Sequence, residues 1–138
     1  MVASSARPCD VVLRMATREI QSEDWDAICK RISELRQQAL LTIEVVRPDG
    51  RRDELARDVP LQSIVLDRSD ACNDRIALNV GAAPHKPLTH VIVQPIHIRL
   101  RPGENGSFNP MQIEAESGTT VLTFRPALRS DIIQGLRA

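Results

Sequence analysis

The sequence has few aromatic residues and no excess of charge of either sign. Its 138 residues include one Trp, two Phe and no Tyr, so platforms on which bases or sugars stack are nearly absent. Basic and acidic residues number 18 each, and the formal net charge is zero. A general nucleic-acid-binding protein carries a basic surface, so this composition argues against one. The hydrophobic core must be built from Ile, Val and Leu.

Cysteine and long apolar runs are also scarce. Cys9, Cys29 and Cys72 form an odd, sparse set that does not suggest a disulfide framework. No apolar run approaches the roughly 20 residues that a membrane-spanning helix needs. The only apolar segment near the N-terminus, residues 11–13, is too short for a signal peptide. We therefore expect a cytoplasmic protein without a membrane partner.

The His, Cys and Asp residues do not stand at the spacing of known sites. His85, His90, His97 and Cys72 are possible metal ligands, but none lies in a zinc-type motif. The aspartates of residues 67–74 lack the calcium-loop pattern. No Gly-x-Ser-x-Gly sequence, phosphate-binding loop or base beside Cys72 is evident. We therefore expect no metal, no cofactor and no catalytic residue.

The first regular element is a helix predicted over Ser22–Gln38. Residues 1–16 are expected to be a flexible extension to a single domain over residues 17–138. Ser22 is a favourable N-cap, with acidic residues following it and basic residues later, as the helix dipole prefers. Trp25 should anchor the helix on the sheet as part of an apolar stripe at helical spacing. The other members are Ile28, Cys29, Ile32 and Leu35.

The remaining chain predicts six or seven antiparallel strands. Strands are expected at residues 40–46, at 55–66 with an interruption at Pro60, at 75–80, at 88–101 as two segments divided by a bend, and at 111–115 and 119–124. Pro48-Asp49-Gly50 is a strong turn signal. Strands and helices do not alternate, which excludes a parallel α/β sheet. The predicted fold is α+β: an N-terminal helix on a curled antiparallel sheet or small barrel, then a short helix that Pro126 opens.

Residues 88–100 are the most strand-like stretch of the chain. Val91-Ile92-Val93 predicts a strand covered on both faces. Pro95 then marks a bend. Beyond it, three apolar residues alternate with three basic ones, which predicts one buried face and one exposed face. The apolar set is Ile96, Ile98 and Leu100, and the basic set is His97, Arg99 and Arg101.

The last two strands form a hairpin whose register can be predicted. A two-residue turn at Ser117-Gly118 opposes Ala115 with Thr120, Ile113 with Leu122 and Met111 with Phe124. This register places most apolar side chains on one face and most polar ones on the other.

The candidate ligand-binding residues are His90, His97, Arg99 and Arg101. Three basic groups at alternate positions could bind an anion or an acidic partner. We prefer a simpler interpretation, in which this solvated strand face pairs with Glu114 or Glu116 of a neighbouring strand. His90 and His97 are seven residues apart, which places them on opposite faces of a straight strand.

Three short patterns resemble a bacterial family of domains of unknown function, the one numbered 5335. They are Thr-Arg-Glu-Ile-x-x-x-x-Trp25, Thr89-His-Val-Ile-x-x-Pro95-Ile-x-Ile, and Ile113-Glu-x-x-x-Gly118-Thr-x-x-Leu-x-Phe124-Arg-Pro. The resemblance covers about residues 17–128. It implies a small bacterial α+β protein and assigns no catalytic residue.

These observations leave three functional hypotheses. The first is a non-catalytic module for protein interaction or assembly, in which exposed strand edges pair with another copy or a protein partner. The second is a small-barrel module that binds an anionic ligand or RNA through His97, Arg99 and Arg101. The third is an enzyme that uses His90 or Cys72. The missing motifs place the enzyme last.

Overall fold

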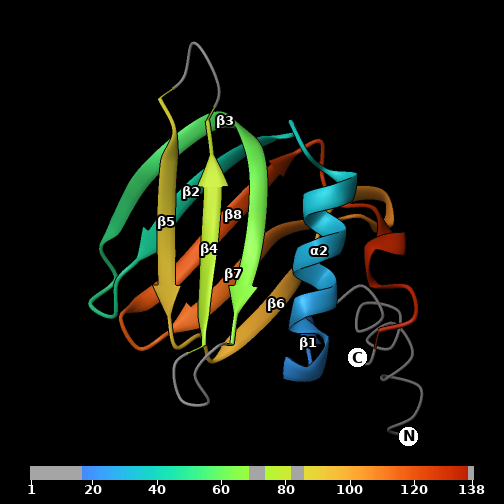
Figure 1. The fold of residues 1–138 in the computed structure, drawn as a ribbon, viewed down its shortest axis with the longest axis horizontal. Coiled ribbons are helices and arrows are strands. Elements are labelled where there is room, and N and C mark those ends of the chain that lie inside the picture. Colours follow the sequence, from blue (N-terminus) through green and yellow to red (C-terminus); the bar gives the residue numbers. More distant parts are fainter. Residues whose placement is uncertain (1–16, 69–73, 82–85, 137–138) are drawn as a thin grey trace, which may run out of the picture.

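The computed structural model describes residues 17–68, 74–81 and 86–136, and it has an α+β fold (Figure 1). One α-helix, α2 (Trp25–Leu35), accompanies an eight-stranded antiparallel sheet. The strands are β1 (Arg18–Ile20), β2 (Leu40–Val46), β3 (Arg52–Asp67), β4 (Arg75–Val80), β5 (Leu88–Val93), β6 (His97–Pro102), β7 (Phe108–Ala115) and β8 (Gly118–Arg125). Three short 3-10 helices are η1 (Ser22–Asp24), η2 (Glu104–Gly106) and η3 (Ser130–Ile133).

The sheet is open. Its strand order is β1-β6-β7-β8-β2-β3-β4-β5, so β1 and β5 are its edges. The expectation of a barrel or a strongly curled sheet was wrong, because these edge strands do not pair with each other. The predicted count of six or seven strands was also too low, since the three-residue β1 is too short to show an alternating pattern.

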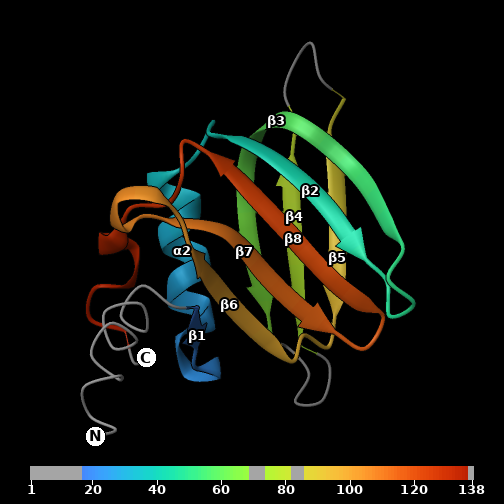
Figure 2. The same ribbon diagram turned by 180° about the vertical axis from the view of Figure 1, so that it is seen from behind.

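β3 connects the two parts of the sheet. Its first half pairs with β2 and its second half with β4, and the strand arches between them (Figures 1 and 2). Pro60, expected to interrupt the strand, lies where β3 changes partner, and its carbonyl accepts a hydrogen bond from the Gly81 amide at 2.8 Å. A missing N–H group is tolerated at such an irregular position.

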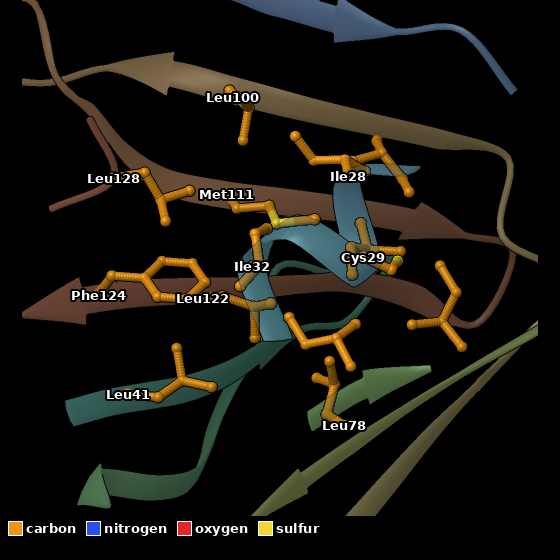
Figure 3. Packing of buried hydrophobic residues seen from close by; sticks show 14 of the residues in the cluster. Ile28, Cys29, Ile32, Leu41, Leu78, Leu100, Met111, Leu122, Phe124 and Leu128 are labelled. Carbon is orange, nitrogen blue, oxygen red and sulfur yellow. The ribbon is translucent and has the colours of Figure 1, made fainter. Parts of the chain in front are cut away.

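The helix packs on the core as predicted, but its bounds differ, and Leu35, expected in the apolar stripe, is 62% exposed at the last position of the helix. Trp25 is buried, and its Nε1 donates a hydrogen bond to the Ile20 carbonyl at 2.9 Å. Ile28, Cys29 and Ile32 lie among the core side chains of the sheet (Figure 3). The 3-10 turn η1 precedes the helix, and the Ser22 side chain does not act as an N-cap for either one. Within the described ranges, no helix is long and apolar enough to cross a membrane.

The β7–β8 hairpin keeps the predicted faces but not the predicted register. Ala115 pairs with Gly118, Ile113 with Thr120 and Met111 with Leu122, so the turn residues are Glu116 and Ser117. The prediction was wrong by two residues along β8. Because side chains alternate with a period of two, this shift leaves the same side chains on the core face.

The predicted bend at Gln94–Pro95 is confirmed, but two other expectations for this stretch were wrong. Val91 and Val93 have exposed fractions of 46% and 50%, so β5 is covered on one face only. Ile96 is 46% exposed, while Ile98 and Leu100 are buried as predicted. At the C-terminal end, the expected short α-helix is the four-residue 3-10 helix η3.

Candidate functional site

The His97–Arg99 face of β6 is neutralised by carboxylates from both neighbouring strands. β1 pairs with β6 and places Glu19 opposite Arg99, while β7 places Glu114 opposite His97. His97 Nδ1 lies 2.5 Å from Glu19 Oε2, and Arg99 lies 3.5 Å from the same carboxylate. Arg99 also donates to Glu114 Oε1 at 2.7 Å. The predicted pairing of this face with Glu114 is therefore confirmed, whereas Glu19 was not foreseen.

The electrostatics of this face follow from that geometry. The hydrogen bond from His97 lowers the pKa of the Glu19 carboxyl below its ordinary value, and the positive charge of Arg99 acts in the same direction. The side chains of Glu19, His97 and Arg99 are each exposed to solvent by about a third or more. Because solvent screens such pairs, they stabilise the fold only slightly. Arg101 is exposed and extends the face toward the end of β6.

His90 belongs to a different part of the molecule. It lies on β5, at the other end of the strand order from β6, and it points toward the core face. Its Nε2 lies 3.2 Å from the hydroxyl of Thr120 on β8. Burial lowers the pKa of the His90 imidazole below its usual value, which favours the neutral ring. The structure therefore does not bring His90 together with His97, Arg99 and Arg101.

The remaining sequence candidates do not form a site within the described ranges. Cys29 is buried, and burial raises the pKa of its thiol to about 12, so a reactive thiolate is disfavoured. In the same ranges, no group of three His, Cys, Asp or Glu side chains could hold a metal ion. Cys9, Cys72 and His85 lie outside the described residues.

A cavity of about 320 Å³ lies beside α2 and the end of β3. Cys29, Ser33 and Leu66 are among its lining residues. The Ser33 hydroxyl at this position donates to the Ile64 carbonyl at 3.0 Å and accepts from the Ile64 amide at 2.8 Å. The Ser33 side chain therefore binds the N–H and C=O groups of Ile64, to which a further strand would otherwise bond.

The edge strand β5 has backbone hydrogen-bonding groups on the side away from β4, where no strand of the described residues pairs with it. The Gln94 amide donates to the Asp74 carbonyl at 2.8 Å. With the β4–β5 register, this bond shows which residues of β5 direct their backbone groups toward β4. In an antiparallel pair, alternate residues direct their N–H and C=O groups to opposite sides of the strand. Thr89, Val91 and Val93 therefore direct these groups away from β4, toward the open edge. All three side chains are exposed as well.

The outer face of β3, β4 and β5 carries an apolar row that ends at this edge. The register aligns Val65 with Ala77 and Ala77 with Val91 across the three strands. Val65 and Val91 have exposed fractions of 48% and 46%. On one side, a polar row is held by side-chain hydrogen bonds of Asn79. Sequence analysis missed this surface because it interpreted the β5 valines as buried.

Comparison with known proteins places the chain in a family without giving it an activity. No curated protein and no solved structure matches the chain. The sequence profile of one family matches residues 16–131, which include α2 and all eight strands. That match agrees with the resemblance carried by the Trp25 helix, the β5–β6 stretch and the last hairpin. The chain belongs to the Family of unknown function (DUF5335).

Proposed function

We propose that this protein is a non-catalytic assembly module, which associates with a second copy of itself through the edge of β5. The observation that carries this proposal is that, within the described part of the chain, no strand pairs with the outer side of β5. Thr89, Val91 and Val93 combine exposed side chains with outward-facing backbone groups. Such a strand is a template for pairing with another strand.

β5 lacks the features with which monomeric proteins protect an edge. Its six residues, Leu-Thr-His-Val-Ile-Val, include no Lys, no other charged side chain and no Pro. They are also rich in β-branched residues, which favour strand pairing. The opposite edge strand β1 has only three residues, and short edge strands pair poorly. β5 is therefore the edge at which we expect association.

The charge of the molecule favours a second copy as the partner. The formal net charge is zero, so two copies approach each other without overall repulsion. β5 itself brings no like charges together, because it has no charged residue. The exposed row from Val65 to Val91 adds apolar area beside the edge, and burying such area favours association.

The alternative of anion or RNA binding has less support. Glu19 and Glu114 lie within 4 Å of His97 or Arg99, so an anion would have to displace carboxylates that already neutralise this face. The scarcity of aromatic residues and the balanced charge also weigh against RNA.

Size-exclusion chromatography with light scattering tests the proposal. The wild-type chain of 15.4 kDa should elute as a dimer, and Val91→Lys should elute as a monomer, because the substitution places like charges at the proposed interface. Leu35→Lys is the matched control, since Leu35 is 62% exposed on α2, and this helix lies away from β5 (Figure 1). Circular dichroism checks that both variants fold. A wild-type protein that stays monomeric from micromolar to millimolar concentration would contradict the proposal.

A further inference from the structure

We infer that the two copies pair their β5 strands antiparallel, about a two-fold axis that passes beside Val91. This inference rests on the proposed self-association and adds its register. Val91 then faces Val91 of the other copy, and Thr89 faces Val93 in both directions. The two open sheets become one continuous sheet with an isologous interface.

The backbone groups at the edge of β5 support a two-fold axis beside Val91. Thr89, Val91 and Val93 are the β5 residues whose N–H and C=O groups point outward. In the register centred on Val91, each of them meets a residue of the same set. Each facing pair can exchange two hydrogen bonds, as in the hydrogen-bonded pairs of an ordinary antiparallel ladder. All the outward groups of β5 are then used.

Two prolines mark the limits of the pairing segment. Pro87 and Pro95 stand at equal distances in sequence on either side of Val91, and neither has a backbone N–H to donate. Both have the same odd–even phase as the three outward-facing residues. In the register centred on Val91, they lie opposite each other, beyond the last bonded pair. The symmetry of the proline positions about Val91 is therefore the symmetry that an isologous strand pair needs.

Shifted registers satisfy fewer of these groups. A two-fold axis at His90 would place Val93 of one copy opposite Pro87 of the other. An axis at Ile92 would place Thr89 of one copy opposite Pro95 of the other. Either shift leaves one outward-facing residue of each copy opposite a residue without an N–H group. The register centred on Val91 avoids this loss.

The outer-face side chains also match in this register. The row formed by Val65, Ala77 and Val91 continues into the same row of the second copy and forms one apolar stripe. Arg75 lies in the adjacent row with Val93, which meets Thr89 of the other copy. Arg75 is therefore not opposed by Arg75 of the other copy, and like charges are kept apart.

Disulfide cross-linking tests the register. Cys9→Ser and Cys72→Ser give the background, with the buried Cys29 retained. Val91→Cys should form a covalent dimer on oxidation, because facing residues of a bonded pair have Cα atoms about 5.5 Å apart, within disulfide reach. Thr89→Cys alone should not, since each Cys would lie roughly 13 Å from its mate along the strand direction. Thr89→Cys combined with Val93→Cys should again cross-link.

The outcomes separate this inference from the function on which it rests. Covalent dimers from Val91→Cys and the double variant, with none from Thr89→Cys, support the register. A dimer in light scattering that gives no cross-link at Val91, or one that cross-links through Thr89→Cys alone, overturns the register and leaves self-association standing. A wild-type monomer overturns both. Light scattering of each unoxidised variant confirms that the new cysteines have not prevented association.

Discussion

Ser33 shows how one side chain can protect the edge of a strand. β3 pairs with β4 along its second half, and α2 approaches its other side. The Ser33 hydroxyl both donates to the Ile64 carbonyl and accepts from the Ile64 amide. We expect Ser33→Ala to lower the free energy of unfolding by about 1–3 kcal/mol, because two partly buried backbone groups lose their partner. Urea denaturation followed by circular dichroism measures this loss.

Ser22→Ala is the control for that measurement. The Ser22 side chain caps neither η1 nor α2, so its removal should change the unfolding free energy little. An N-capping role would instead cost about 1 kcal/mol. Equal losses in the two variants would show that the Ile64 contacts of Ser33 contribute nothing beyond the removal of a hydroxyl.

His90 should make the stability depend on pH. Burial lowers its pKa in the folded protein below the ordinary value of 6.5. The unfolded chain therefore binds the proton more readily, and the free energy of unfolding should fall as the pH drops from about 7 toward 5. Above the unfolded pKa this loss is absent. His90→Gln, which retains a polar group near Thr120, should reduce the slope.

Urea denaturation of the wild type and His90→Gln at several pH values in that range measures the effect. The same slope in the wild type and His90→Gln would mean that burial of His90 has no influence on stability. The size of the effect should be modest, since the ring is only half-buried.

At the scale of elements, the sequence predicts best where a strand has one buried face. The predicted bounds of β2 and β4 agree with the structure, because alternation marks each strand and turn residues such as Gly50 end it. The position of Trp25 correctly predicted which face of α2 packs on the core. Strand identity and face are local properties, so local sequence determines them.

Properties that depend on more distant contacts were predicted less well. The register of β8 was wrong by two residues, because the apolar pattern fixes the face of a strand but not its sliding along the partner. The three-residue β1 exists through its pairing with β6 and has too little sequence to show a pattern. The exposure of Val91 and Val93 arises because the outer face of the sheet is uncovered there, as it also is at Val65 on the interior strand β3, and no local pattern encodes this.

The candidate site residues also divide into those that local sequence predicted and those that depend on more distant contacts. Arg99 and Glu114 were correctly paired because they lie on adjacent strands of a recognisable meander. Glu19 was missed together with β1. For the proposed interface, the sequence does contain a signal in the equal spacing of Pro87 and Pro95 about Val91. That signal becomes interpretable only once β5 is known to be an edge and its outward-facing residues are known.

For the whole molecule, self-association should couple assembly to folding. A partner that binds only the folded chain stabilises it by mass action, so the melting temperature should rise with protein concentration. Val91→Lys should melt at a temperature that is independent of concentration, because the monomer then unfolds alone. Differential scanning calorimetry over a wide range of protein concentration compares the two.

Leu35→Lys should behave like the wild type in this experiment. Both positions are exposed and apolar, but only Val91 lies on the β5 edge. A concentration-dependent melting temperature in the wild type and Leu35→Lys, but not in Val91→Lys, would connect the stability of the whole chain to that edge. If all three proteins melted independently of concentration, β5 would be stable as a free edge, and the symmetry of its flanking prolines would need another explanation.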